Sequence, residues 1–168
     1  MKNLLKMGAI ILVMAACQPP QEQGPARYTT DAPEITTAKA AMQAYLDGDW
    51  DALKATFADN AEVYHNSNTA VTPDDNIASL REDLQLVSSY SLGDEQYWER
   101  IIDDNGEYWV YFWGTWNAVH AATEKDIEVP FHLAWQYEDG KVVEEYGAWD
   151  NTQMLLAEQE AAAAAEEM

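Results

Sequence analysis

The sequence predicts an α+β domain in which three N-terminal helices pack on a strongly curved antiparallel sheet. In the first half of the chain, apolar residues recur at the spacing of helices. After Gly93 the spacing changes to two, and aromatic and β-branched residues fill the segments 94–103, 107–120, 127–138 and 141–150. Helices followed by an uninterrupted series of strands are typical of this class.

Three helices are predicted before the strands. The first carries one apolar stripe over residues 38–46. Asp49 is suited to cap a short second helix, after which residues 62–67 form a strand. Thr72 and Pro73 fit the N-cap and the first position of a third helix, because the hydroxyl accepts from a free backbone N–H and proline has none to satisfy. The apolar stripe of this helix is Ile77, Leu80, Leu84 and Val87.

The dipeptides "NG" and "DG" between the strands are typical of hairpin loops, the second at 139–140. Counting outward from this second turn places Glu144, Tyr146 and Asp150 on the apolar face of the last hairpin, and Glu145 and Trp149 on the opposite face. Carboxylates on a buried face favour a hydrated cavity beside them. Asp150 is equally suited to cap the segment that follows the sheet.

Composition limits the class of protein. Hydrophobic residues make up 48% of the chain, with 7 Trp and 9 Tyr, which excludes general disorder. The formal net charge is −21, from 9 Lys and Arg against 30 Asp and Glu. Such a surface repels a phosphate backbone, so nucleic acid is not expected as a partner.

The N-terminus has the features of an export signal. Lys2 and Lys6 accompany an apolar run that has the length of a signal-peptide core and is too short to span a bilayer. The residues before Cys17, the only cysteine, resemble a bacterial lipoprotein box, which implies that 1–16 is a signal peptide and that Cys17 is lipidated. Gln18 resembles the pattern sorted to the outer membrane. We therefore expect a membrane-anchored protein of the bacterial cell envelope that faces the periplasm.

Three segments follow the signal peptide. Residues 17–33 are rich in Pro, Gln and Gly, so we expect a flexible tether that starts at the lipidated cysteine. Residues 34–157 form the folded domain. Residues 158–168 are rich in Ala and Glu without an apolar stripe, and we expect an acidic tail.

Two stretches indicate a family. "AYLDGDWDALKATFADNAEVYHN" (44–66) opens the domain and "WQYEDGKVVEEYGAWDN" (135–151) closes the sheet. Over about residues 36–156 the chain resembles the nuclear transport factor 2-like superfamily, especially its SnoaL-like branch. The resemblance implies a cone in which a bent sheet wraps the first helices around a mostly apolar pocket. It also implies a possible homodimer built on the outer face of the sheet.

His65 is the first candidate for chemistry. In the resemblance to ketosteroid isomerases it takes the position of their general-base aspartate, which points into the cone. A histidine titrates near pH 6.5, roughly where proton transfer at neutral pH requires it. The oxyanion tyrosine of those enzymes corresponds here to Ala41, so steroid isomerisation is not carried over. The SnoaL-like cyclases use an Asp/His pair, a role that resemblance of type gives to His65 with Asp150.

Two functions remain open. The first is a module that binds a small hydrophobic molecule in the pocket. The alternative is a cofactor-free isomerase, cyclase or dehydratase, with His65 and Asp150 as general acid and base and Tyr146 or Tyr64 as oxyanion donor. The enzyme requires His65 and Asp150 to converge in one pocket. The pocket wall is expected to consist of Trp50, Tyr64, Trp116, Phe131, Leu133 and Trp135.

Metals and cofactors are not expected. His65, His120 and His132 do not have the spacing of metal ligands. The sequence also contains no nucleophile elbow, phosphate-binding glycine loop or paired cysteines, which are the usual signals for covalent hydrolysis and nucleotide binding.

Overall fold

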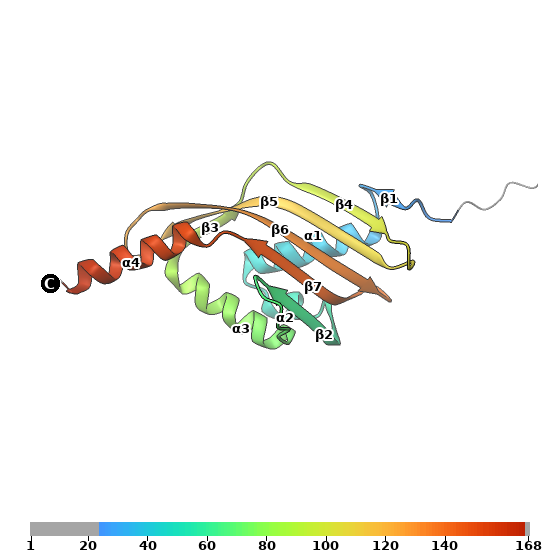
Figure 1. Ribbon diagram of the computed structural model, residues 1–168, viewed down its shortest axis with the longest axis horizontal. Coiled ribbons are helices and arrows are strands. Elements are labelled where there is room, and N and C mark those ends of the chain that lie inside the picture. Colours follow the sequence, from blue (N-terminus) through green and yellow to red (C-terminus); the bar gives the residue numbers. More distant parts are fainter. Residues whose placement is uncertain (1–23, 167–168) are drawn as a thin grey trace, which may run out of the picture.

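The computed structural model describes residues 24–166, in which four α-helices lie on a seven-stranded sheet (Figure 1). The predicted signal peptide (1–16) and the lipidation site Cys17 lie outside the described residues. The helices are α1 (Pro33–Asp47), α2 (Trp50–Lys54), α3 (Pro73–Asp83), which continues into the 3-10 turn η1 (Leu84–Leu86), and α4 (Thr152–Glu166). Among the described residues, no helix is both long and apolar enough to cross a membrane.

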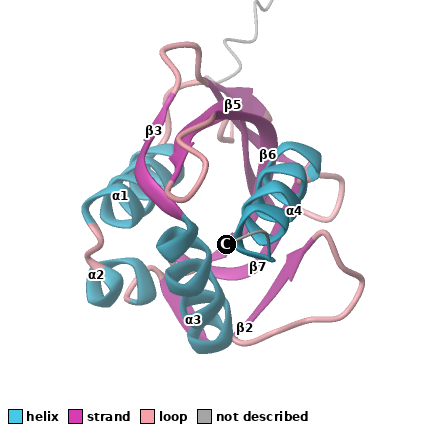
Figure 2. Ribbon diagram, turned by 90° about the vertical axis from the view of Figure 1, so that its left-hand side faces the viewer, coloured by secondary structure: helices cyan, strands magenta, loops and turns pink. Residues whose placement is uncertain are grey.

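The sheet curls around the helices (Figure 2). Its strands are β1 (Tyr28–Thr29), β2 (Phe57–His65), β3 (Val87–Leu92), β4 (Tyr97–Ile102), β5 (Tyr108–His120), β6 (Asp126–Glu138) and β7 (Lys141–Trp149). Their order is β1-β4-β5-β6-β7-β2, and β3 also pairs with β5. The predicted α+β fold is confirmed. The sheet is mixed, however, because β2 runs parallel to β7 while the other pairs are antiparallel.

Local chemistry fixes the helix boundaries. Gly48 ends α1 with a φ of 68°, which glycine adopts without strain. Asp49 caps α2 by accepting from the N–H of Ala52 at 3.0 Å. Thr72 caps α3 by accepting from the N–H of Asp75 at 3.2 Å. The predicted starts of α2 and α3 are confirmed.

The main core lies between α1 and the concave face of the sheet. Its most deeply buried large side chains are Phe112, Val63, Val110 and Val142. Burial of each such side chain contributes roughly 1.5 to 3 kcal/mol, so this layer holds the helices against the sheet. Gly114 leaves space for the Phe112 ring, which lies 2.4 Å from where a Cβ atom at Gly114 would be.

A bulge in β7 overturns the predicted register. Between the pair Tyr137–Val142 and the pair Gln136–Glu144, residue Val143 is one extra residue on β7. Side chains alternate between the faces of a strand, so one extra residue exchanges the two faces beyond it.

The exchange reverses the prediction for the last hairpin. Glu145 and Gly147 are buried on the concave face, opposite Trp135 and Leu133. Tyr146 is instead 41% exposed on the outer face. The prediction of Glu144 and Tyr146 on the buried face and Glu145 on the outer face is wrong. A count of pairs from the turn does not include the bulge.

Three segments are more ordered than predicted. Within the expected tether, Tyr28–Thr29 pairs with β4, and the side chain of Arg27 donates to the carbonyl of Ile102 at 3.2 Å. β3 was not predicted, since Val87 was assigned to the third helix. Most of the expected tail belongs to α4, which buries Ala157.

Candidate functional site

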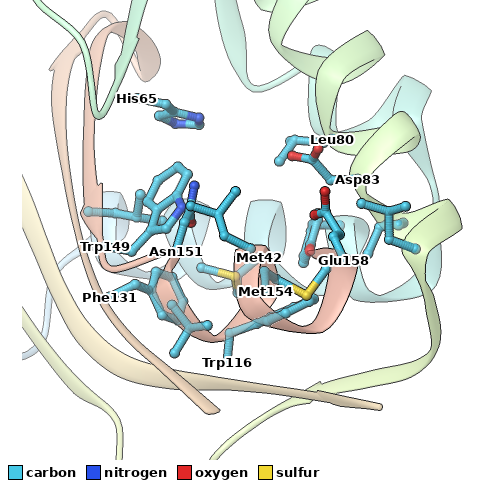
Figure 3. Close-up of a pocket in the computed structure, with 16 residues that line it drawn as sticks. Met42, His65, Leu80, Asp83, Trp116, Phe131, Trp149, Asn151, Met154 and Glu158 are labelled. Atoms are coloured by element: carbon cyan, nitrogen blue, oxygen red, sulfur yellow. The ribbon is translucent and has the colours of Figure 1, made fainter. Parts of the chain in front are cut away.

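A largely apolar cavity of about 220 Å³ lies between the concave face of the sheet and the helices α1, α3 and α4. Figure 3 shows His65 and Trp149 on one side of this cavity, and Asp83 and Glu158 on the other. The apolar wall includes Met42, Leu80, Trp116, Val129, Phe131, Leu133 and Met154. The cavity therefore offers apolar contact along most of its surface, and its polar groups are His65, Asn151 and Tyr45 together with the carboxylates Asp83 and Glu158.

His65 and Glu145 form a hydrogen-bonded pair on one side of the cavity. The Nε2 atom of His65 lies 2.5 Å from Oε1 of Glu145. The other carboxylate oxygen accepts from the indole Nε1–H of Trp135 at 2.8 Å. The side chain of Glu145 is 8% exposed and that of His65 is 17% exposed. Because water is largely excluded, each of these charge-assisted hydrogen bonds is strong.

The sheet brings the pair together. His65 ends β2 and is the parallel partner of Gly147 on β7, so its side chain points to the same face as Glu145, two residues earlier. The missing side chain at Gly147 makes room for the imidazole, because a Cβ atom there would lie 2.7 Å from Cδ2 of His65. Both the bulge and this glycine are needed for the pair to form.

Asn66 fixes the end of β2 against β7. Its side-chain amide donates to the carbonyl of Trp149 and accepts from the N–H of Trp149, each at 3.1 Å. Its φ is 47°, a left-handed conformation in which asparagine is several-fold enriched. The Trp149 ring then meets His65 edge to face, with ring centroids 5.0 Å apart. The imidazole is thus held by contacts with Glu145, Gly147 and Trp149, all on β7.

The hydrogen bonds decide which nitrogen of His65 is available. An ionised Glu145 can only accept, so the proton of a neutral imidazole lies on Nε2. The lone pair is then on Nδ1, the nitrogen that Glu145 does not occupy. A carboxylate in this position orients the ring and stabilises the imidazolium that forms when Nδ1 takes a proton. The pair is suited to general acid and base chemistry.

Two carboxylates face each other on the other side of the cavity. Asp83 comes from the end of α3 and Glu158 from α4 (Figure 3). Partial burial, together with the negative charges of Glu158 and Glu82, raises the pKa of Asp83 above its ordinary value. This side of the cavity therefore disfavours negative charge.

Three of the six residues predicted for the pocket wall line the cavity, namely Trp116, Phe131 and Leu133. Trp135 does not line this cavity, and its indole N–H donates to Glu145 instead. Trp50 packs on Tyr45 of α1, with ring centroids 6.2 Å apart.

Tyr64 and Tyr146 lie on the outer face of the sheet. Their rings stack at 4.7 Å, and their hydroxyls donate to Glu62 and Glu144. The hydrogen bond to Glu62 raises the pKa of Tyr64 to about 12. Neither hydroxyl lines the cavity, because the side chains of Tyr64 and Tyr146 are on the outer face of their strands.

Asp150 does not converge with His65. Its carboxylate accepts from the hydroxyl of Thr152 at 2.5 Å and from the N–H of Thr152 at 2.9 Å, and these bonds lower its pKa. Asp150 thereby caps the start of α4, which is the second of the two roles that the sequence left open. The partner of His65 is Glu145.

The sequence did not predict several residues of the site. Glu145 and Trp149 were assigned to the outer face, because a bulge has no clear signal in "KVVEEYGAW". Met154 and Glu158 were missed with α4, although the spacing of Met154 and Ala157 is that of one helical face. This short apolar stripe was the available signal for a helix that closes the cavity.

No metal site is apparent in residues 24–166. This range contains no group of three or more His, Cys, Asp or Glu side chains that could hold a metal ion. The pair His65–Glu145 by itself supplies two donors, fewer than the three protein ligands of catalytic zinc sites.

Comparison with known proteins identifies the type of domain. The model of the SnoaL-like domain family matches residues 38–145. A search of curated proteins found no match.

Solved structures share the fold at low sequence identity. A SnoaL-like protein from Shewanella denitrificans, described as a proposed polyketide cyclase, is 14% identical with a TM-score of 0.59, covering 77% of this chain and 99% of its own. IdmH from Streptomyces antibioticus, also a proposed polyketide cyclase, is 16% identical with a TM-score of 0.60, over 75% and 97%. A nuclear transport factor 2-like protein of unknown function from Burkholderia pseudomallei is 17% identical with a TM-score of 0.59, over 74% and 96%.

Proposed function

The chain belongs to the SnoaL-like domain family, and we propose that it is a cofactor-free enzyme of the cyclase or isomerase type. Its substrate is a small apolar molecule with a ring or carbonyl group. His65 is the general acid and base, and Glu145 orients it. The observation that carries the proposal is the buried pair of His65 with Glu145 at the end of an apolar cavity.

The reaction class follows from the groups present. A base beside an apolar cavity removes a proton from a carbon next to a carbonyl group, and the imidazolium then returns it to another atom of the same molecule. Exclusion of water by the bound substrate strengthens the interaction of the imidazolium with Glu145. The proposed polyketide cyclases with the same fold have names that imply chemistry of this class.

One donor in the cavity wall is suited to the substrate oxygen. Burial raises the pKa of the Tyr45 hydroxyl, which therefore stays protonated. The indole of Trp116 lies beside Tyr45, and its Nε1–H is buried without a hydrogen-bond partner of normal geometry within residues 24–166. A carbonyl oxygen that accepts from the Tyr45 hydroxyl is stabilised as it becomes negatively charged. We assign to Tyr45 the role that was expected of Tyr64 or Tyr146.

The test is proton exchange at carbon. In D2O, bicyclic ketones such as 2-tetralone lose their α-protons to a general base, and NMR follows the loss. We expect the protein to accelerate this exchange, and His65→Gln to reduce the acceleration by about 100-fold or more. The matched control is His132→Gln, since His132 lies outside the cavity and bonds the carbonyl of Phe112. Equal rates for the protein and His65→Gln would contradict the proposal.

A ligand-binding module is the second candidate. It is favoured by the apolar lining of the cavity, which suits a small hydrophobic molecule whether or not chemistry follows. Trp116 and Trp149 line the cavity, so bound ketones change tryptophan fluorescence. Saturable binding without proton exchange in any of the ketones indicates the module.

Anchoring at the outer membrane through Cys17 belongs to the same proposal. It rests on the lipoprotein-like sequence before Cys17. Mass spectrometry of the protein from membranes is expected to find acylation at Cys17, and Cys17→Ser is expected to release the protein. A soluble, unmodified protein that retains residues 1–16 would contradict the anchor.

A homodimer is also proposed, with the outer face of the sheet as its interface. Trp109, Tyr111 and Trp113 form a row of neighbouring rings on this face, next to Tyr146. Trp and Tyr are enriched at interfaces. Light scattering of the protein and of Trp113→Glu is expected to give a dimer and a monomer, respectively.

A further inference from the structure

A second, smaller cavity lies behind the pair of His65 and Glu145. Its volume is about 60 Å³, and Glu145, Asn76 and Thr56 lie in its wall. Glu145 therefore stands between two cavities, because its Oε1 is bonded to His65 of the larger one. Met42, Tyr45 and Leu80 belong to both walls.

Asn76 is the unusual residue in this cavity. It lies in the first turns of α3 and is 5% exposed. Its backbone N–H donates to the carbonyl of Thr72. Its side-chain amide makes no hydrogen bond to another residue within 24–166, yet it is not among the fully buried polar groups without a partner, and Asn76 lines the cavity. Water in the cavity would satisfy this amide, because leaving a buried amide unpaired costs about 1 to 3 kcal/mol.

The other polar groups around the cavity do not supply that partner. The Thr56 hydroxyl donates to the carbonyl of Leu53 at 2.7 Å. Oε1 of Glu145 is bonded to His65, and Oε2 accepts from Trp135. Each oxygen has a second lone pair, which can accept from a water molecule. A cavity needs roughly 10 to 15 Å³ and two or more polar partners to hold one water molecule. This cavity has about 60 Å³ and a mostly apolar wall, in which Asn76, Thr56 and Glu145 are polar.

We propose that the smaller cavity holds ordered water that connects Asn76 to Glu145, and that Asn76 positions this water as a proton relay between the pair His65–Glu145 and solvent. The relay rests on the proposed acid and base function of His65. The hydration of the cavity does not.

The relay moves one proton out and one proton back. As Nδ1 takes a proton from the substrate, the Nε2 proton passes to Oε1 of Glu145 and from there to the water held by Asn76, which is connected to solvent past the partly buried Thr56. When Nδ1 gives its proton to another atom of the substrate, the water and Glu145 return a proton to Nε2. His65 then has the tautomer with which it started, and Glu145 is again ionised. A substrate in the larger cavity covers His65, so the smaller cavity is the route that stays open.

Hydration is tested by NMR without any ligand. The probe is the indole Nε1–H of Trp135, which is bonded to Glu145 in the wall of this cavity. We expect a cross-relaxation signal between this proton and a long-lived water. Asn76→Leu removes the amide and fills the cavity, so the signal is lost and the exchange of the indole proton with solvent slows by about tenfold.

Two further variants complete the design. Asn68→Leu makes the same change on an exposed loop residue and is expected to leave the signal unchanged. Ala41→Val fills the cavity from α1 and keeps Asn76, so it is expected to lose the signal and serves if Asn76→Leu does not fold. No water signal in the unmodified protein, or a signal that survives in both cavity variants, would overturn the proposal.

The relay is tested by exchange of 2-tetralone protons. We expect Asn76→Leu to lower kcat several-fold with KM unchanged, and Asn76→Ala, which leaves room for more water, to recover part of the rate. A hydrated cavity with an unchanged kcat would overturn the relay. Failure of His65→Gln to affect exchange instead overturns the proposed function, whatever the water signal.

Discussion

The imidazole of His65 lies so close to the backbone of Gly147 that a Cβ atom there would be 2.7 Å from Cδ2 of the ring. The same atom would lie 2.6 Å from the ring of Trp149 and 3.0 Å from Leu133. Glycine at this position is what allows His65 to reach Glu145. The close pairing of β2 with β7 at Gly147 therefore brings His65 within hydrogen-bond distance of Glu145.

Gly147→Ala is expected to displace the His65 ring and break its bond to Glu145. Forcing a methyl group into a filled site costs about 1 to 3 kcal/mol of unfolding free energy, which urea denaturation measures. Gly93→Ala is the matched control, because a Cβ atom there meets its nearest neighbours at 3.5 Å. Its effect is expected to stay within about 0.5 kcal/mol. Equal costs for the two variants would refute the close packing of His65 on β7.

The two faces of β7 predict stability effects of different size for the adjacent residues Glu144 and Glu145. Glu145→Ala leaves the Trp135 indole and His65 without a partner, so we expect a loss of about 2 to 4 kcal/mol in unfolding free energy. Glu144→Ala removes an outer-face acceptor of the Tyr146 hydroxyl, and we expect a change within about 0.5 kcal/mol. The reverse order would mean that the bulge at Val143 is absent and that the register counted from the turn is correct.

Asp83 is expected to destabilise the fold at neutral pH. Since its pKa is raised in the folded protein, the folded state binds the proton more tightly than the unfolded chain does. Stability from this group is therefore present at low pH and falls as pH rises through the raised pKa. Asp83→Asn is expected to increase Tm at pH 7 by about 1 to 2 °C, because solvent screens the partly exposed group.

The pH dependence provides the control for Asp83. The gain in Tm is expected to vanish near pH 3, where Asp83 is protonated in both states, and to shrink in a Glu158→Gln background. Glu95→Gln, on an exposed loop, is expected to leave Tm unchanged. A gain of equal size at both pH values would exclude ionisation as its cause.

Much of the fold could be predicted from the sequence because its signals are local. The caps Asp49 and Thr72 and the turn at Asp139-Gly140 each act within a few residues, and the structure has them as expected. β3 was missed because Val87 continues the apolar spacing of α3. The parallel pairing of β2 with β7 joins residues about 80 positions apart, which local patterns do not specify.

The candidate site was predicted less completely than the fold. The resemblance pointed His65 into the cone, and the structure has it in the cavity wall. The resemblance of type paired His65 with Asp150, and counting from the turn put Asp150 on the apolar face. The structure pairs His65 with Glu145 instead, because one extra residue, Val143, changes the face of every later side chain on β7. Turn geometry alone does not reveal such a bulge, which depends on how β7 packs on β2 and β6.

The most direct test concerns Nδ1, the nitrogen of His65 that Glu145 does not contact. At pH 8, where an ordinary imidazole is neutral, we expect 15N NMR to show a proton on Nε2 and a lone pair on Nδ1. The Nε2 proton is expected to resonate downfield, through its bond to Glu145, and to lose this shift in Glu145→Gln. A proton on Nδ1, or a spectrum that Glu145→Gln leaves unchanged, would contradict the assignment of His65 as the base.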